Sequence, residues 1–393
     1  MFDTIEQARL QALHLFQDEA TQLRAVIAIH NTRLGPALGG CRFLPYPSDT
    51  DAIKDAIHLA QGMSYKAALA GLPLGGGKAV IIKPHPLIDR AALLQAFGRC
   101  VAQLNGQYIT SVDSGSNTDD MDEIAKTTHY VTAARYHHVD PSPNTALGVL
   151  YGIQAALAHH RGRNTLQGVH VAIQGVGNVG KRLAERLHEQ GATLTLSDTD
   201  LVKAQRLAKV LNARWVASED IVDTACDVFA PCGLGGTLNR HTVARLRCQI
   251  VAGAANNQLT SPTQDDALFQ RGILYAPDFV INAGGLIQVA HSVNAPTQAP
   301  HAQPTVTERT QHIGHTLRQI FTLSAQQRCP TGQIATTLAK NILYANGPAS
   351  PSNARPNERS FTPPNTPSSA QTSTPSHAPI LRESSATLRE TTP

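Results

Sequence analysis

The sequence predicts an α/β protein with two domains, an N-terminal α/β domain and a second domain of the Rossmann type, followed by a disordered tail. The chain has 393 residues, which is long enough for two hydrophobic cores. Strand-like and helix-like runs alternate over residues 1–137 and again over 168–282. From residue 346 to 393 the composition shifts to Ser, Thr and Pro with few large apolar residues. We expect this tail to be disordered, because it cannot bury enough surface to offset its ordering entropy.

We place the first domain at residues 1–139. Its strand-like and helix-like runs follow one another at 25–30, 51–62, 79–83, 90–104, 107–112 and 118–127. This alternation is typical of a layered α/β domain.

Two prolines predict the hinge between the domains. In the segment Asp140–Asn144, Pro141 and Pro143 fix the backbone and disfavour a helix before them, so we expect an extended connection. A helix at 146–159 then opens the second domain, which we place at 140–330.

The last part of the second domain contains an irregular segment. Residues 291–304 are rich in Pro, Ala, Gln and Thr and predict a loop, and a helix follows at 307–326. We expect residues 331–345 to form a C-terminal helix that returns to the first domain.

A glycine-rich turn in the second domain predicts a dinucleotide site. An apolar strand at 169–174 leads directly into a G-x-G-x-x-G sequence, made of Gly175, Val176, Gly177, Asn178, Val179 and Gly180. A helix at 181–190 follows, with Gly191 at its C-terminal end. The glycines allow a pyrophosphate to approach the N-terminus of this helix, where free N–H groups and the helix dipole favour anions.

The next strand specifies which dinucleotide binds. Residues 192–198 form an apolar run that ends in Asp198, 18 residues after Gly180, where a carboxylate is expected to bind the ribose hydroxyls. Asp198 and Asp200 would repel a 2′-phosphate, so the sequence predicts NAD rather than NADP. Two further strands, at 227–232 and 249–257, end in turns that include Cys232 and Asn256 and face the ligand edge of the sheet.

Two lysines in the first domain suggest amine chemistry. Lys66 ends the segment Gly62–Lys66, and Lys78 follows three consecutive glycines, at positions 75–77. We expect the glycines to let a small ligand approach the backbone. Two ammonium groups in one partly dry pocket repel each other, so one lysine should lose its proton near neutral pH and act as a base.

Composition excludes several other classes. The net charge of +4 is small, and no basic cluster is interleaved with aromatic residues, so we expect no nucleic-acid partner. No run has the length of a membrane span or of a signal peptide, which predicts a cytoplasmic protein. The six cysteines form no C-x-x-C pair and the histidines have no metal-ligand spacing, so we expect reduced thiols and no metal.

Taken together, the motifs resemble those of the leucine, valine and phenylalanine dehydrogenases, in the wider glutamate dehydrogenase superfamily. The resemblance covers residues 18–344, and leucine dehydrogenases are the most similar. It depends on five specific motifs, at residues 34–40, 62–66, 74–78, 175–180 and 278–285. It implies an enzyme that deaminates an L-amino acid oxidatively with NAD, giving a 2-oxo acid and ammonia, and that assembles into dimers or octamers.

The resemblance also assigns roles to individual residues. Lys66 would hold the substrate carboxylate, helped by the backbone of Gly39 and Gly40, while Lys78 would be the general base and Asp113 would handle protons beside the amino group. The nicotinamide end of NAD would contact Thr145, Asn256 and Asn282.

The resemblance predicts an apolar substrate pocket. Leu38 and Met63 would line it, and Ser111 stands where the family has a small apolar residue. Val112 replaces a glutamate that leucine dehydrogenases often have. Ile313 and Leu317 are further candidates for the pocket wall. An acidic substrate would find no partner there, which argues against glutamate.

Three functions remain open at this stage. A branched-chain amino acid dehydrogenase, with leucine as the substrate, is the first. A phenylalanine or other aromatic amino acid dehydrogenase is the second, because a few methylenes decide between them. A binding or regulatory protein that kept the fold without turnover is the third.

Overall fold

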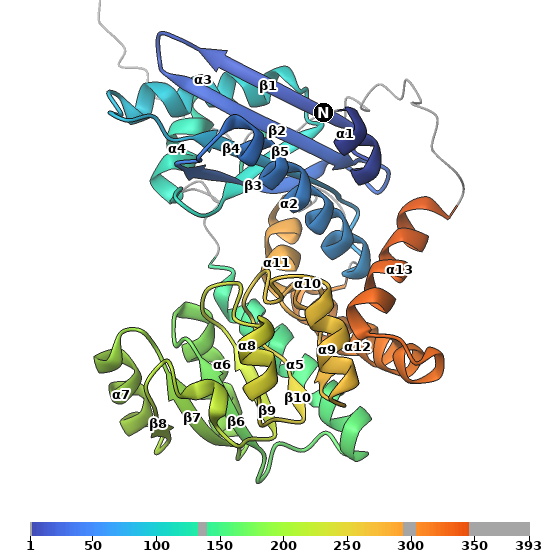
Figure 1. Ribbon diagram of the computed structural model, residues 1–393. Helices are drawn as coiled ribbons and strands as arrows, with labels where there is room; N and C mark the ends of the chain where they lie inside the picture. Colours follow the sequence, from blue (N-terminus) through green and yellow to red (C-terminus); the bar gives the residue numbers. More distant parts are fainter. Residues whose placement is uncertain (1, 133–139, 294–303, 346–393) are drawn as a thin grey trace, which may run out of the picture. The chain divides into compact units, whose positions relative to one another are not determined.

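The computed structural model describes residues 2–132, 140–293 and 304–345. Within these ranges the chain forms a mixed five-stranded sheet and a parallel six-stranded sheet, each accompanied by helices (Figure 1). This confirms the predicted α/β class with two sheets. The predicted tail at 346–393 and most of the loop at 291–304 lie outside the described residues, and the domain boundaries at 139/140 and 330/331 stay predictions.

The first sheet has the strand order β1-β2-β4-β3-β5. Its strands are β1 (Ala12–Asp18), β2 (Leu23–Asn31), β3 (Ala37–Leu44), β4 (Gly75–Ile82) and β5 (Tyr108–Val112). β1, β2 and β4 pair antiparallel, and β4, β3 and β5 pair parallel. The predicted strands correspond to β2, β4 and β5, whereas β1 and β3 were not predicted. β3 contains Gly39 and Gly40, which lower strand propensity and made its residues resemble a loop.

Helices cover both faces of this sheet. The helices of this region are α1 (Phe2–Ala8), α2 (Asp49–Leu69), α3 (Arg90–Gln103) and α4 (Thr118–Ala125). Alternate residues of β2 point to opposite faces: Val26 and Ala28 pack with α2, while Ile27 and Ile29 pack with α3 and α4. Both faces are therefore buried, and β2 is apolar along nearly its whole length.

Helix α2 is seven residues longer at its C-terminal end than predicted. The predicted helix ends at Gly62, but α2 continues to Leu69, so Lys66 lies within the helix. Gly62 lowers helix propensity by about 1 kcal/mol, which the packing of α2 against β2 and β4 overcomes. A Cβ atom at Gly62 would meet nothing within 4 Å, so no close contact requires glycine there.

The second sheet has the order β11-β10-β9-β6-β7-β8 and is parallel throughout. Its strands are β6 (His170–Gln174), β7 (Thr193–Ser197), β8 (Arg214–Trp215), β9 (Val228–Pro231), β10 (Ile250–Val251) and β11 (Leu274–Tyr275). The order places β6 between β9 and β7, where a Rossmann sheet reverses direction and binds its ligand.

Helices also pack on both faces of the second sheet. They are α5 (Ser142–Arg161), α6 (Asn178–Glu189), α7 (Leu201–Val210), α8 (Arg240–Arg245) and α9 (Thr263–Gln270), with a short 3₁₀ helix, η2 (Ile221–Asp223). Val171 and Ile173 of β6 pack in the cluster that contains α5, α6 and α7, while Ala172 packs in the cluster of α8 and α9. Helices α10 (Asp278–Ile281), α11 (Gly284–Val293), α12 (Val306–Gln327) and α13 (Thr331–Tyr344) complete the described chain.

The prediction of an extended hinge at residues 140–144 was wrong in part. Helix α5 begins at Ser142, four residues earlier than predicted, with Pro143 in its first turn. Proline is tolerated there because the first N–H groups of a helix have no partner within the helix. Only Asp140 and Pro141 precede the helix, and Asp140 pairs with Arg182 of α6 at 2.7 Å.

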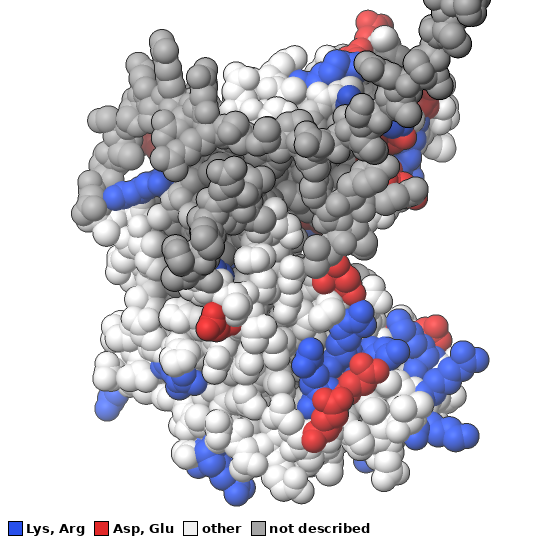
Figure 2. Space-filling model, turned by 180° about the vertical axis from the view of Figure 1, so that it is seen from behind, with Lys and Arg blue, Asp and Glu red and all other residues white. Residues whose placement is uncertain are grey.

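Basic side chains gather on one side of the face shown in Figure 2, and carboxylates lie among them. Two contacts of α6 show the same mixing: Lys181 lies 3.8 Å from Glu185, and Arg182 pairs with Asp140. The positive charge of this surface is therefore partly neutralised.

Candidate active site

Lys78 lies inside β4, the strand that separates β2 from β3. Its side chain is only 7% exposed, and its ammonium pairs with the carboxylate of Asp113, which follows β5. Burial lowers the pKa of Lys78 to about 7, helped by the nearby cations Arg42 and Lys66, while the charge of the Asp55 carboxylate opposes the shift. We predicted that repulsion between the two lysines lowers this pKa. That repulsion contributes less to the pKa shift than burial does.

The three glycines before Lys78 do not have the use that we predicted. A Cβ atom at Gly75 would lie 2.0 Å from the carbonyl oxygen of Asn31, and one at Gly76 would lie 2.0 Å from the backbone nitrogen of Ser64. At Gly77 it would lie 2.8 Å from the Tyr108 ring. The space left by the missing side chains is filled by the protein itself. The glycines allow β4 to pack closely against β2, β5 and α2, and leave no room for a ligand.

An arginine that the sequence analysis missed completes the charge network of Lys78. Arg42 of β3 lies 3.5 Å from Asp113 and donates to both carboxylate oxygens of Asp55, at 2.7 and 3.0 Å. Tyr46 donates to the same carboxylate at 2.6 Å. A signal was available, since a charged residue two positions after Gly40 in an otherwise apolar run shares its face of the strand.

Lys66 contacts a different set of groups. Its ammonium donates to the side-chain oxygen of Asn256 at 3.2 Å, and Asn282 donates to the same oxygen at 2.7 Å. Burial lowers the pKa of Lys66 to about 8, and the charge of Asp278 opposes this shift. Three predicted site residues, Lys66, Asn256 and Asn282, therefore meet at one oxygen atom.

The predicted substrate-pocket residues lie around the same strands. Gly39 and Gly40 of β3 are paired with Thr110 and Ser111 of β5. A Cβ atom at Gly40 would lie 2.8 Å from a carboxylate oxygen of Asp113, so glycine makes room for that carboxylate. Leu38 is buried, whereas Met63 and Ser111 are partly exposed.

The prediction that Ile313 and Leu317 line the substrate pocket was wrong. Both are buried in the interface between α12 and α5. A Cβ atom at Gly148 would lie 2.7 Å from Ile313, and one at Gly152 would lie 3.0 Å from Leu317. The two side chains fill the grooves left by these glycines, so they join two helices and leave no surface for a substrate.

The glycine turn after β6 has the geometry of a dinucleotide site. Gly175 has φ +91°, a left-handed conformation that favours glycine, and a Cβ atom at Gly180 would lie 2.0 Å from the Gly175 carbonyl oxygen. By contrast, a Cβ atom at Gly177 would meet nothing within 4 Å. Gly177 is also the N-cap of α6 and makes no side-chain cap. This open helix N-terminus fits a pyrophosphate.

The remaining residues of the predicted cofactor site surround this turn. Asp198, after β7, accepts hydrogen bonds from the N–H groups of Val176 at 2.7 Å and Asp200 at 3.0 Å. The Thr199 hydroxyl lies 3.5 Å from the oxygen that accepts from Asp200, while the oxygen that accepts from Val176 retains capacity for a ribose hydroxyl. Asn178 is exposed, Val179 is partly exposed, and the Cβ atom of Cys232 lies 3.3 Å from the position of a Cβ at Gly180.

Thr145 and Asn144 are engaged within the protein. The hydroxyl of Thr145 donates to the carbonyl of Pro141 at 2.9 Å, and Asn144 donates to Gln288 of α11. Asn282, by contrast, is buried, and its side-chain oxygen has no hydrogen-bond partner within the described residues. A buried polar atom without a partner indicates a missing donor, such as one from a ligand.

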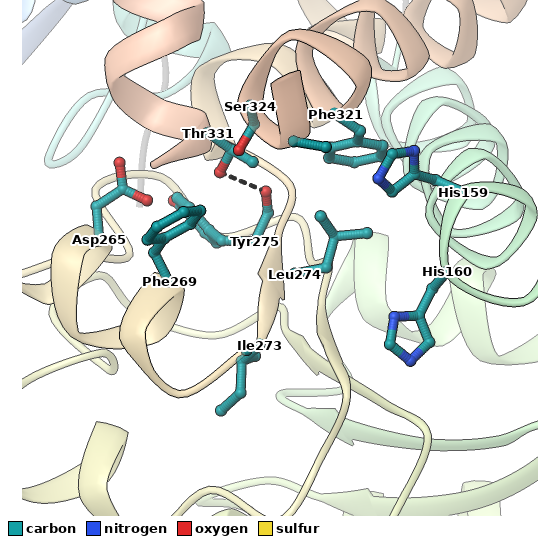
Figure 3. A pocket seen from close by; sticks show the side chains of 12 residues that line it. His159, His160, Asp265, Phe269, Ile273, Leu274, Tyr275, Phe321, Ser324 and Thr331 are labelled. Carbon is teal, nitrogen blue, oxygen red and sulfur yellow. Dashed lines mark hydrogen bonds between the residues drawn. The ribbon is translucent and has the colours of Figure 1, made fainter. Parts of the chain in front are cut away.

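A separate cavity of about 190 Å³ lies between α5, α9, β11, α12 and the start of α13. Figure 3 shows His159 and His160 on one side of it and Asp265 on the other. The side chain of Asp265 accepts the N–H of Gly332, and Thr331 donates to the carbonyl of Tyr275 at 2.7 Å. Neither lysine lines this cavity, so we do not regard it as the active site.

Residues 2–132, 140–293 and 304–345 contain no candidate metal site and no candidate membrane span. Within them no group of His, Cys, Asp and Glu side chains could hold a metal ion. None of the helices in the same ranges is both long and apolar enough to span a membrane. All six cysteines are free thiols.

A Rossmann sheet with an open glycine turn, together with a buried lysine of lowered pKa, is the arrangement of a dinucleotide-dependent dehydrogenase. Comparisons with known proteins agree. Residues 10–130 match the family model described as the Glu/Leu/Phe/Val dehydrogenase dimerisation domain. Residues 140–202 and 199–340 match the Glutamate/Leucine/Phenylalanine/Valine dehydrogenase model.

Individual relatives are similar along most of their length. The leucine dehydrogenase of Geobacillus stearothermophilus is 40% identical over 346 residues, 87% of this chain and 93% of the relative. The L-tryptophan dehydrogenase of Nostoc punctiforme is 41% identical over 344 residues, 87% of this chain and 96% of the relative. A crystal structure of L-tryptophan dehydrogenase from Nostoc punctiforme superimposes with a TM-score of 0.77 at 40% identity, covering 87% of this chain and 98% of that one.

The chain therefore belongs to the Glu/Leu/Phe/Val dehydrogenase family. It is an amino acid dehydrogenase with a Rossmann-type domain, and its cofactor is NAD, as predicted.

Proposed function

We propose that this protein catalyses the NAD-dependent oxidative deamination of an apolar L-amino acid, with leucine as the preferred substrate, and the reverse reductive amination. The products would be the 2-oxo acid and ammonia. The observation that supports this most is the difference between the partners of the two lysines. The ammonium of Lys78 is buried against the carboxylate of Asp113, whereas the ammonium of Lys66 donates to the uncharged side chain of Asn256, so Lys78 suits proton transfer and Lys66 suits binding of an anion.

Each lysine would have its own step. The protonated Lys66 would hold the substrate carboxylate and orient the amino acid. NAD, when bound, would accept the hydride from the α-carbon, which leaves an imine on the substrate. The neutral Lys78 would then take a proton from a water molecule as that water attacks the imine carbon. Asp113, in contact with Lys78, would return protons to the nitrogen so that ammonia can leave.

The cofactor site would hold NAD along the glycine turn. The N-terminus of α6 at Gly177 would bind the pyrophosphate, and Asp198 the adenine ribose. The buried oxygen of Asn282 could accept a hydrogen bond from the nicotinamide amide. Asn256, Thr145 and Cys232 would complete the site, and the negative charge of Asp198 would disfavour NADP.

Tryptophan is a second candidate substrate. A relative of similar identity and coverage is an L-tryptophan dehydrogenase, which fits the aromatic alternative of the sequence analysis. Leucine stays our first choice because leucine dehydrogenases from several organisms match the chain at 39–46% identity. A non-catalytic protein is disfavoured by the family and by the retention of Lys66, Lys78 and Asp113 together.

A substrate panel tests the proposal. NADH formation by the purified protein would be followed with NAD or NADP and leucine, valine, isoleucine, phenylalanine, tryptophan and glutamate. We expect NAD and leucine to give the highest kcat/KM. Lys78→Ala should reduce kcat by about 10² to 10⁴ if Lys78 transfers protons. Lys83→Ala, an exposed lysine directly after β4, is the matched control and should retain activity.

The panel separates the alternatives. A higher kcat/KM with tryptophan would replace leucine as the substrate, and full activity of Lys78→Ala would remove the proposed base. If no amino acid reduced NAD, the proposed function would be wrong.

We further propose a homo-oligomer, a dimer or an octamer, in the cytoplasm. The model matched by residues 10–130 is named a dimerisation domain. β1 lies at the edge of the first sheet, and its Leu15 is 57% exposed. Free thiols are typical of reducing compartments. Light scattering after gel filtration would give the mass; a monomer at micromolar concentration would contradict the proposal.

A further inference from the structure

A buried histidine contacts α2, the helix that bears Lys66. His30, near the end of β2, is 1% exposed. Its Nδ1 lies 2.7 Å from the hydroxyl of Ser64, and its Nε2 lies 3.3 Å from the hydroxyl of Tyr344. The edge of its ring faces Tyr65, with 5.8 Å between the ring centroids. Both ring nitrogens are therefore fixed by hydroxyl groups.

Ser64 connects this histidine to the active site. It belongs to α2, two residues before Lys66. Its backbone nitrogen and hydroxyl lie 2.0 and 2.4 Å from the position that a Cβ atom would take at Gly76, which lies two residues before Lys78. Ser64 is thus one of the places where the helix of one lysine touches the strand of the other, and its hydroxyl contacts His30.

Tyr344 connects the same histidine to the last helix. α13 ends at Tyr344, and its final turn is fixed by two arginines. Arg33 donates to the carbonyl of Leu343 at 3.1 Å, and the guanidinium of Arg9 lies over the Tyr344 ring, 5.1 Å from its centroid. The hydroxyl that His30 meets is therefore held in place from its other side.

The imidazole ring of His30 is neutral, which is consistent with a ring held in one orientation by hydrogen bonds. Burial lowers its pKa to about 4, and an interaction of the ring with the backbone carbonyl of Ala8 opposes the shift. The ring is neutral at any pH where a lysine acts as a base. A neutral imidazole has one donor and one acceptor nitrogen, so each of the two hydroxyls has a defined partner.

We propose that His30 is a positioning residue for substrate binding: through Ser64 it fixes the turn of α2 that bears Lys66, and through Tyr344 it joins that turn to α13. The inference depends on the proposed role of Lys66 in holding the substrate carboxylate. It assigns no proton transfer to His30, which would act only by holding the ammonium of Lys66 in place.

Kinetics of three variants test this role. His30→Gln removes the ring, Ser64→Ala removes one hydrogen bond and Tyr344→Phe removes the other. We expect the KM for leucine to rise about tenfold in His30→Gln and by a smaller factor in the others, as is usual when a buried hydrogen bond is lost. The KM for NAD and kcat should change by less than about twofold, since the chemistry and the cofactor turn are not touched.

A double variant and a control histidine make the test specific. If His30 acts through Ser64, the effects of His30→Gln and Ser64→Ala on the KM for leucine should not multiply in the double variant. His14→Gln is the control, because His14 lies on β1 in the same sheet and has no hydrogen bond to α2 within the described contacts. Its KM for leucine should equal that of the unchanged protein.

Two results would overturn the inference. In one, the variants lower the unfolding midpoint but leave the KM for leucine unchanged, which would make the role purely structural. In the other, the KM values for leucine and NAD rise equally. If His30→Gln does not fold, the milder Ser64→Ala and Tyr344→Phe give the same comparison.

A failure of the proposed function can be distinguished from a failure of the inference about His30. Without turnover by the unchanged protein, leucine binding to the NADH-loaded protein can be measured by calorimetry. Equal affinity of the unchanged protein and the variants, or no binding by either, would then overturn the role of His30.

Discussion

Two glycine-rich segments of this chain, residues 75–77 and 175–180, have opposite uses. In the first, a Cβ atom at any of the three glycines would lie within 3 Å of the protein's own atoms. In the second, Gly175 and Gly180 pack against the protein as well, but Gly177 faces open space at the start of α6. Glycine can therefore bring two parts of a fold together or leave room for a ligand, and the two uses cannot be distinguished by composition.

The largest expected effect concerns the packed segment. In Gly76→Ala the new methyl group would lie 2.0 Å from the backbone nitrogen of Ser64, and backbone atoms cannot move away easily. We expect the free energy of unfolding to fall by about 3 kcal/mol or more, as for severe overpacking. Denaturant unfolding measures this. A variant as stable as the unchanged protein would show that β4 and α2 are less tightly joined than described.

The matched change in the open segment should affect binding and leave the fold intact. Gly177 has φ −65°, which alanine adopts readily, and no atom lies near its missing side chain. In Gly177→Ala we expect the free energy of unfolding to change by less than about 1 kcal/mol. The dissociation constant of NADH should rise about tenfold, equal to about 1.4 kcal/mol, because the methyl group would meet the pyrophosphate. Unchanged affinity in a fluorescence titration would remove Gly177 from the cofactor site.

The two segments should also differ in their response to pH. With a pKa of about 7, Lys78 is mostly protonated below pH 7 and mostly neutral above it. If the neutral form is the base, kcat/KM should fall about tenfold for each unit below pH 7. NADH affinity should stay constant from about pH 6 to 8, since the residues of the glycine turn, 175–180, carry no titratable side chain.

Arg42→Gln sharpens this pH test. The charge of Arg42 helps to lower the pKa of Lys78. Removing it should raise that pKa, so the acid limb of the kcat/KM profile should move to higher pH. The substrate titrates identically in both proteins, so the difference between the two profiles reports on the enzyme. An unmoved limb would show that Lys78 is not the titrating group.

The smallest expected effect is on cofactor choice. Asp198→Asn keeps an oxygen acceptor for the N–H of Val176 but removes the negative charge. We expect the preference for NAD over NADP, as the ratio of kcat/KM values, to fall by about fivefold to tenfold, in line with the loss of one repulsive charge at a partly exposed site. An unchanged ratio would mean that groups other than Asp198 reject the 2′-phosphate.

Local patterns were sufficient to predict the second domain. The G-x-G-x-x-G sequence after an apolar strand, the helix with Gly191 at its end and the acid at Asp198 are all close in sequence, and each has a local physical cause. The structure has β6, α6 and β7 within three residues of the predicted limits, and Gly191 has φ +82° as expected for a helix end.

The first domain was harder to predict because its contacts are distant in sequence. The partners of the three glycines, Asn31, Ser64 and Tyr108, come from three separate segments, so nothing near residue 76 indicated that the space was filled. The extension of α2 past Gly62 depends on packing against β2 and β4, and β3 contains two glycines that resemble a loop.

The sequence by itself determined the fold class, the family and the presence of Lys66, Lys78 and Asp113, because motifs and alternating patterns are local. Only the tertiary structure decided the lowered pKa values of the two lysines. Lys78 has a pKa of about 7 because β2, β3 and α2 bury it beside Arg42, and Lys66 is held by Asn256, 190 residues away. Burial and Coulomb energies depend on distances in space, which distances along the chain do not determine.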